Sequence, residues 1–216
     1  MSVINLWGNV PDWAYDSVKS LLEALKLSEP GTYEHCVRVG EYSRKLARDL
    51  GLNEYQQKVA EFSGMLHDIG KIGIDKSILL KPGRLDPMEI DIMKNHSIMS
   101  ENIIKPFAHH PFFAHIIPAV RGHHERMDGE GYPDKIMGDE IPLISRIILT
   151  VDTYDAMGEN RAYRKGLPED VIFAELKRCS GSQFDTHIVK TFLEAQPFWK
   201  NETDNDTSHL IIKRIA

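Results

Sequence analysis

Apolar residues recur every three or four positions along most of the chain, which is the spacing of an amphipathic helix. We see no alternating stretch that predicts a half-buried strand, and no internal repeat. The pattern therefore predicts an all-α fold. The expected helices cover residues 11–27, 32–50, 54–67, 86–105, 112–124, 143–157, 168–179 and 185–195.

Local signals mark several helix ends. Pro11 suits a first helical turn, and Gly51 stops the second helix. Asp86 and Glu89 have the spacing of a capping box, and Pro118 predicts a kink in the fifth helix. We expect residues 28–199 to form the main domain, preceded by a helical extension over 1–27. A tail follows over 200–216, to which we assign no function.

Composition and charge exclude several classes of protein. A chain of 216 residues can bury one sizeable core, and no apolar run approaches the length of a membrane span. Its net charge of -6 argues against a general nucleic-acid binder. The start of the chain lacks the features of a secretory signal. The two cysteines, Cys36 and Cys179, predict neither a disulfide framework nor a thiolate metal site. We expect a cytoplasmic protein that does not contact membranes.

Histidine and aspartate residues fall on the apolar faces of five predicted helices. Each of them alone has an ordinary explanation, as a hydrogen-bonded core histidine or a helix cap. Together they would cost several kcal/mol if they were buried without partners, whereas one shared metal centre satisfies all of them. The residues are His35, His67, Asp68, His96, His123, His124, Asp152 and Asp155. The remaining histidines lie outside these stripes, and we expect surface or packing roles for His109, His110, His115, His187 and His209.

The donor types limit the metal. Imidazole and carboxylate groups suit iron, manganese, zinc, nickel or cobalt, and argue against calcium. Seven ligands are too many for one catalytic ion that keeps an open position, so two ions are expected, about 3.5–4 Å apart. Asp68, next to His67, is the natural bridging ligand. A metal-bridging hydroxide could then attack a phosphodiester. With no Walker motif or nucleophilic Ser or Cys arrangement in the chain, the sequence favours metal-assisted phosphoester hydrolysis.

Several motifs resemble, in order, those of the HD-GYP domains within the HD phosphohydrolase superfamily. The most specific are "HDIGK" at residues 67–71 and "HHERMDGEGYP" at residues 123–133. "HCVRVGEYS" at 35–43, "MKNH" at 93–96 and "RAYRK" at 161–165 agree with them. The resemblance covers about residues 28–195. It implies an all-helical HD core with additional C-terminal helices.

The resemblance also implies an activity and a site. The activity is hydrolysis of the bacterial second messenger cyclic di-GMP to pGpG, and in many members on to GMP, with iron or manganese as the leading metals. Lys71 would act with Asp68 in catalysis beside a substrate phosphate. Asp155, Arg161 and Arg164 match positions near the substrate. The implied metal ligands are His35, His67, Asp68, His96, His123, His124 and Asp152.

Departures from the family pattern bear on the metal count and on the substrate. Gly31 stands where some members place a glutamate that helps to hold a third metal, so we expect two metals. Gly158 and Ala162 replace residues that are usual near the substrate loop. Two alternatives stay open: an HD phosphohydrolase acting on another cyclic dinucleotide, and a non-hydrolytic receptor. The GYP loop is expected to shape substrate access and to offer a surface for a protein partner.

Overall fold

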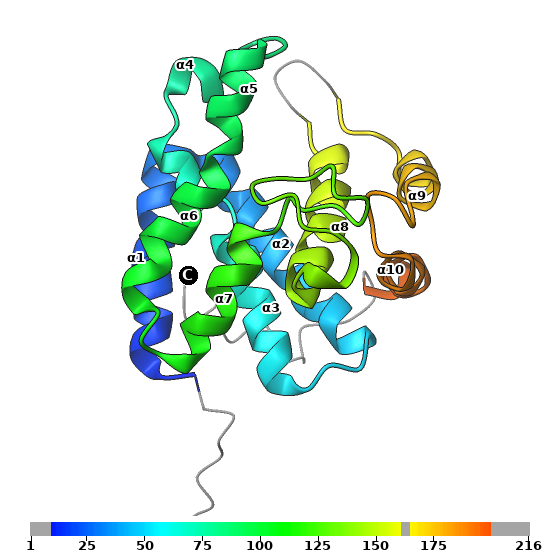
Figure 1. The fold of residues 1–216 in the computed structure, drawn as a ribbon, viewed down its shortest axis with the longest axis horizontal. Helices are drawn as coiled ribbons and strands as arrows, with labels where there is room; N and C mark the ends of the chain where they lie inside the picture. The colour runs from blue at the N-terminus through cyan, green and yellow to red at the C-terminus, as the bar shows by residue number, and fades with distance from the viewer. Residues whose placement is uncertain (1–9, 161–164, 200–216) are drawn as a thin grey trace, which may run out of the picture.

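The computed structural model describes residues 10–160 and 165–199, and within them it is all-α, with no strand. Figure 1 shows the helices as one layered bundle, with α1 on one side and α9 and α10 on the other. The α-helices are α1 (Asp12–Ser28), α2 (Pro30–Asp49), α3 (Glu54–Leu66), α4 (Lys76–Leu79), α5 (Pro87–Lys94), α6 (His96–Ile104), α7 (Pro111–Arg121), α8 (Leu143–Gly158), α9 (Glu169–Arg178) and α10 (Thr186–Trp199). The 3-10 helices are η1 (Ile69–Gly73), η2 (Lys105–Phe107) and η3 (Gly138–Glu140). The predicted fold class is confirmed.

Local caps account for several boundaries. Asn53 and Gln56 form a capping box at the start of α3, and Asp86 and Glu89 form the predicted one at the start of α5. The Glu29 carboxylate accepts hydrogen bonds from backbone N–H groups in the first turn of α2. These side chains satisfy donors that a helix start leaves without intrahelical partners.

The pairing of α2 with α3 forms the centre of the fold. A Cβ atom on Gly64 would lie 2.8 Å from the Cα of Gly40, so the two backbones touch and neither site tolerates a side chain. One apolar cluster joins this pair to α1 and α7, through residues such as Leu22 and Phe113. A second cluster joins it to α8, α9 and α10, through residues such as Phe192. The site lies between these two clusters.

The predicted helix over 86–105 is in fact two helices that meet at Asn95. The Asn95 N–H donates to the carbonyl of Ile92, three residues back, so α5 ends there and α6 begins at His96. Ile92, four positions before His96 on the face of the expected helix, is 41% exposed, so that face is not buried along its whole length. The physical reason is packing: α6 lies against η1 and α7, whereas α4 and α5, both fully described, contain no buried residue and project from the body (Figure 1).

The predicted helix over 112–124 ends earlier, at Arg121. Gly122 is its C-cap, and the Glu125 N–H closes a turn on the Gly122 carbonyl. His123 and His124 therefore lie in this turn, and the prediction that they continue the helical face was wrong. Pro118 is accommodated inside α7.

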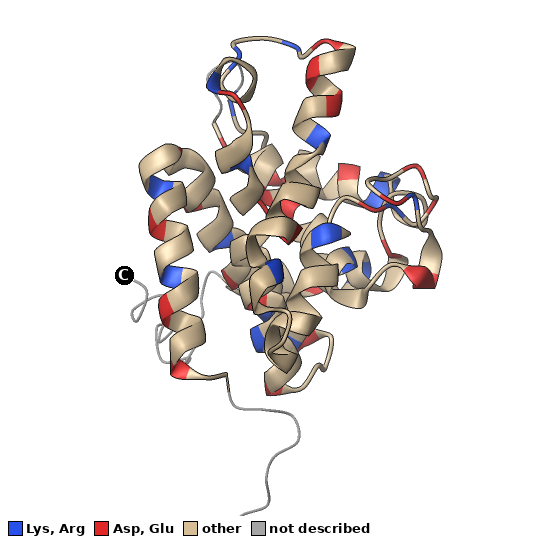
Figure 2. Cartoon of the chain, turned by 60° about the vertical axis from the view of Figure 1, so that its left-hand side comes forward, with Lys and Arg blue, Asp and Glu red and all other residues tan. Residues whose placement is uncertain are grey.

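Two groups of predictions fall outside the described residues. Arg161 and Arg164 belong to the first group, and the tail from residue 200 forms the second. Within the described residues, no helix is both long and apolar enough to cross a membrane. Charges of both signs alternate along the helices in the view of Figure 2, which agrees with the modest net charge.

Candidate metal centre

The structure brings all seven predicted metal ligands together. They come from α2, the end of α3, the start of α6, the turn after α7, and α8. Their donor atoms form two groups, each within 4.8 Å: His35, His67 and Asp152 in the first, and His96, His123 and His124 in the second.

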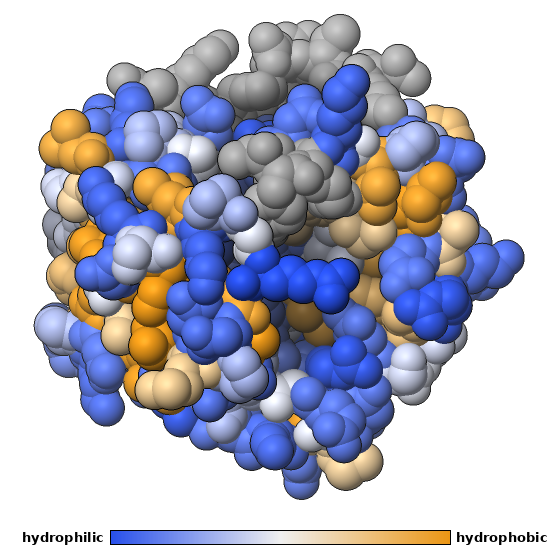
Figure 3. Space-filling view, turned by 90° about the horizontal axis from the view of Figure 1, so that it is seen from above, coloured by the Kyte–Doolittle hydropathy of each residue, from blue (hydrophilic) through white to orange (hydrophobic). Residues whose placement is uncertain are grey.

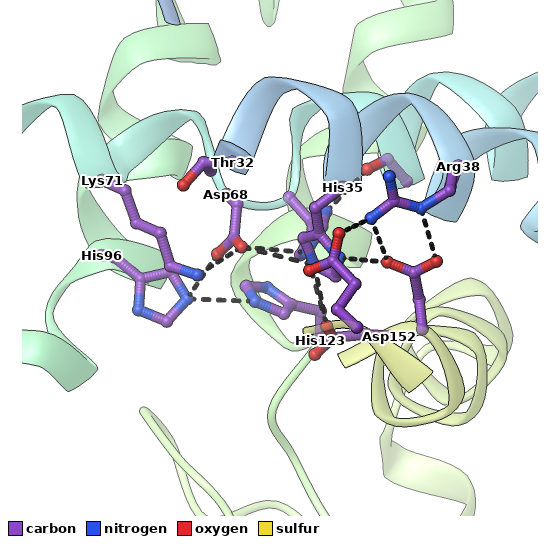
Figure 4. A network of polar contacts seen from close by, with 12 residues as sticks. Thr32, His35, Arg38, Asp68, Lys71, His96, His123 and Asp152 are labelled. Carbon is purple, nitrogen blue, oxygen red and sulfur yellow. Dashed lines mark hydrogen bonds and ion pairs between the residues drawn. The ribbon is translucent and has the colours of Figure 1, made fainter. Parts of the chain in front are cut away.

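Asp68 lies between the two groups (Figure 4). Its Oδ2 atom is 3.3 Å from Nε2 of His67 and 3.7 Å from Nε2 of His35. Its Oδ1 atom is 3.2 Å from Nε2 of His96, in the second group. One oxygen thus faces each group, which is the placement of a carboxylate that bridges two ions.

Three of the histidines are held by the same local hydrogen bond, from Nδ1 to the backbone carbonyl three residues earlier. Nδ1 of His67 lies 2.6 Å from the carbonyl of Gly64, and Nδ1 of His123 lies 2.5 Å from that of Val120. His96 makes the equivalent contact, at 2.7 Å, with the carbonyl three residues before it. A carbonyl can only accept a hydrogen bond, so each Nδ1 carries a proton, and in the neutral ring each Nε2 presents a lone pair.

These lone pairs converge. Nε2 of His96 lies 3.2 Å from Nε2 of both His123 and His124. The buried atoms Nε2 of His67 and Oδ1 of Asp68 find no hydrogen-bond partner in the described part of the chain. Acceptors placed this close repel one another unless a cation lies among them. The donor set therefore fits a divalent metal, with the carbonyl contacts as its outer support.

Burial keeps the second group neutral. Burial, together with the neighbouring imidazoles, lowers the pKa of His123 well below its ordinary value and that of His124 to about 3. The pKa of His96 is lowered as well, first by burial. Neutral imidazole is the form that ligates a metal, so this group is ready to bind at neutral pH.

The first group contains carboxylates, which raise the pKa of its imidazoles. Burial lowers the pKa of His35, but hydrogen bonds to Asp152 and Asp155 outweigh it and raise the pKa to about 9. Burial raises the pKa of Asp68, yet the Lys71 and His67 charges bring it well below its ordinary value. Without a metal this group retains a proton, so metal binding there releases one.

Asp155 lies behind His35. Its Oδ2 accepts a hydrogen bond from Nδ1 of His35 at 2.7 Å, and both of its oxygens accept from Arg38, at 2.8 and 2.9 Å. Asp155 therefore fixes the ring that carries a donor atom, and its predicted contact with substrate stays a prediction. Our sequence analysis missed Arg38. The available signal was its position three residues after His35, on the same helical face.

Lys71 lies beside Asp68, and its predicted contact with a substrate phosphate stays a prediction. Its Nζ donates to Oδ2 of Asp68 at 2.5 Å, and its side chain keeps 23% exposure. Burial lowers the pKa of Lys71, but the charge of Asp68 outweighs burial and raises the pKa above its ordinary value, so the ammonium stays protonated.

The GYP loop folds back on the ligand turn. The Tyr132 ring stacks on the ring of His124, with centroids 4.6 Å apart. The backbone N–H of Tyr132 donates to the backbone carbonyl of His124. Nζ of Lys94 lies 5.6 Å from the centre of the Tyr132 ring. A Cβ atom on Gly131 would lie 2.5 Å from the backbone N of Arg126, so only glycine fits there. Hydrophilic side chains line part of the rim of a hollow in the face seen from above (Figure 3).

The other described histidines stay out of the ligand groups, as predicted. Nδ1 of His110 accepts the N–H of Phe112 at the start of α7, and Nδ1 of His115 lies 2.8 Å from the carbonyl of Pro111. His209 lies outside the described residues.

Comparison with known proteins agrees with this picture. Residues 19–188 match the family described as HD domain. The chain is 35% identical over 202 residues to a "Cyclic di-GMP phosphodiesterase" of Thermotoga maritima, covering 92% of this chain and 55% of that protein. It is 34% identical over 192 residues to "3'3'-cGAMP-specific phosphodiesterase 2" of Vibrio cholerae, covering 88% and 36%. The chain thus spans about half or less of these relatives.

A solved structure shares the fold. Bd1817, a HDG"Y"P protein from Bdellovibrio bacteriovorus, superposes with a TM-score of 0.63 and covers 86% of this chain and 63% of its own. At 15% identity, this likeness supports the fold alone.

Proposed function

The chain belongs to the HD domain family, and from that membership we propose that it is a metal-dependent phosphodiesterase acting on a cyclic dinucleotide. The observation that carries the proposal is the convergence of buried Nε2 lone pairs around Asp68, whose oxygens face both ligand groups. The printed names of relatives at 35% and 34% identity supply the class of substrate.

We infer that two divalent ions bind, one to each ligand group, with Asp68 shared. The donors suit iron or manganese first, and zinc, nickel or cobalt as well. When bound, such ions supply an acidified water molecule as nucleophile and neutralise charge on the phosphodiester. The first ion would be held by His35, His67 and Asp152, and the second by His96, His123 and His124.

The remaining residues act on these ligands or on the substrate. Lys71 holds Asp68 in place, and its partly exposed side chain would donate to a substrate phosphate. Asp155 orients His35, and Tyr132 covers His124. Arg161 and Arg164 remain proposed substrate ligands, because a guanidinium pairs with a phosphate through two parallel hydrogen bonds.

Cyclic di-GMP is the first candidate substrate, and 3'3'-cGAMP is the second because a relative specific for it is equally close in sequence. The two molecules share their phosphodiester backbone and differ in one base. Discrimination between them must therefore come from contacts with the bases rather than from the metal centre.

The test is turnover by the full chain after anaerobic loading with iron or manganese, with metal content measured on the same sample. Cyclic di-GMP, 3'3'-cGAMP and cyclic di-AMP are offered separately, and the products are separated by chromatography. We expect a linear dinucleotide from at least one of them. The Asp68→Ala variant should lose both metal and turnover, whereas His109→Ala, an exposed histidine outside the ligand groups, should keep both.

Two outcomes contradict the proposal. Unchanged turnover in Asp68→Ala would show that this site does not catalyse the reaction. A metal-loaded protein that binds a cyclic dinucleotide but never cleaves it would instead be a receptor.

A further inference from the structure

Cys36 is a buried thiol at the edge of the candidate metal centre. It follows His35 on α2, and adjacent helical residues point about 100° apart. While His35 faces Asp152 and Asp155, Cys36 is directed toward the α1 and α3 side, with no exposed surface. The chain has one other cysteine, Cys179, next to the end of α9.

The thiol is not alone there. The Cys36 sulfur, a ring nitrogen of His67 and a carboxylate oxygen of Asp68 lie within 4.8 Å of one another, and all three side chains are buried. Nε2 of His67 and Oδ1 of Asp68 have no hydrogen-bond partner among the described residues. A buried imidazole and a buried carboxylate, each with an unsatisfied acceptor atom, thus lie beside a sulfur atom that can also donate an electron pair.

We propose that Cys36 is a sulfur ligand of the ion that His67 and Asp68 hold. Typical bonds are about 2.3 Å from metal to sulfur and about 2.0–2.1 Å from metal to nitrogen, so donors on one ion lie up to about 4.4 Å apart. The observed group comes within a few tenths of an ångström of that limit. As the metal–sulfur bond forms, the thiol proton is released to solvent.

Packing alone does not account for the choice of cysteine. Cys36 belongs to the apolar cluster that contains Phe62 and Leu66, and an alanine or valine could occupy the same cluster. Only the thiol adds a soft donor to a site otherwise made of nitrogen and oxygen. Such a donor shifts metal preference toward zinc and cobalt and away from manganese. Our sequence analysis expected no thiolate metal site, because Cys36 and Cys179 alone gave no such pattern.

The test uses cobalt as both ligand and reporter. The full metal-free chain is titrated with Co²⁺ without oxygen, absorption is recorded from the near ultraviolet to the visible, and bound cobalt is measured by elemental analysis. A cobalt–thiolate bond gives a charge-transfer band in the near ultraviolet. We expect this band in the wild type and in Cys179→Ser, and its loss in Cys36→Ser while cobalt remains bound.

Each outcome decides the question. A wild type that binds cobalt without the band overturns the proposal, as does a Cys36→Ser variant that keeps it. If Cys36→Ser and Cys36→Ala fail to fold, the band in Cys179→Ser still assigns the sulfur, because the chain has two cysteines. A competition between zinc and manganese should show at least a tenfold loss of zinc preference in folded Cys36→Ser. These readouts require metal binding but no turnover, so they stand even if the proposed phosphodiesterase activity fails.

Discussion

Replacing Gly70 with alanine should damage both stability and metal binding. Gly70 lies in η1 against α6, where a Cβ atom would lie 2.1 Å from the carbonyl oxygen of His96 and 2.5 Å from the backbone N of Ser100. The contact is also tied by hydrogen bonds. The Gly70 N–H donates to Oγ of Ser100, which itself donates to the carbonyl of His67. This contact therefore sets how closely His67 and His96 approach.

The expected size follows from that geometry. Both clashing atoms belong to the backbone and cannot rotate away, so α6 must shift by about 1 Å to restore ordinary contact. Overpacking a core typically costs about 1–3 kcal/mol, and a clash with backbone belongs at the upper end. For a domain of this size, about 3 kcal/mol lowers the melting temperature by roughly 6–12 °C.

Thermal unfolding followed by circular dichroism measures this loss, with Gly83→Ala as the matched control. No described atom lies within 4 Å of a Cβ on Gly83, so that variant should melt within a few degrees of the wild type. Metal content should fall in Gly70→Ala because His96 moves away from Asp68. In the wild type, Nε2 of His96 lies 3.2 Å from Oδ1 of Asp68. If Gly70→Ala matches Gly83→Ala in both melting temperature and metal content, the account of this contact is wrong.

Three further predictions concern single side chains. Asp155→Asn removes the charge that orients His35 and should weaken metal binding about 10–100-fold, measured by metal titration; unchanged affinity would contradict this role. Burial raises the pKa of Glu61 to about 7, so its stabilising contribution is complete below about pH 4.5 and is lost as the pH rises through 7. Urea unfolding should therefore show wild-type stability falling over this range by at most about 3 kcal/mol more than in Glu61→Gln, and parallel profiles would refute the shift. Tyr132→Phe keeps the ring stacked on His124, so its free energy of unfolding in urea should equal that of the wild type. Tyr132→Ala removes the ring and should lower that free energy by about 1 kcal/mol. Equal losses in the two variants would assign the effect to the hydroxyl instead.

The sequence was sufficient where the deciding interactions are local. Capping residues set the starts of α3 and α5, and the apolar period placed α2 and α8 with the correct faces inward. His35 and Asp152 were found because they lie in phase with those apolar stripes. The second ligand group does not follow from that periodicity, because His123 and His124 lie in the turn after α7.

The sequence was insufficient where packing between distant segments decides where a helix ends or which side chains meet. The break at Asn95 and the turn at Gly122 depend on where α6 and α7 lie against η1 and α8, although the apolar period runs through both positions. The contact of Arg38 with Asp155 joins residues 117 positions apart. No local pattern reports such a contact.

The α4–α5 arm carries a consequence for how this protein can change. In both helices, which the structure describes completely, no side chain is buried, so the arm contributes little to the cohesion of the core. Substitutions there are nearly neutral for folding outside the capping pair Asp86 and Glu89, yet the arm leads directly into His96 at the candidate metal centre. Mutations can therefore accumulate in it at little cost in stability, which makes residues 76–94 the natural segment to randomise in a library selected for a new substrate.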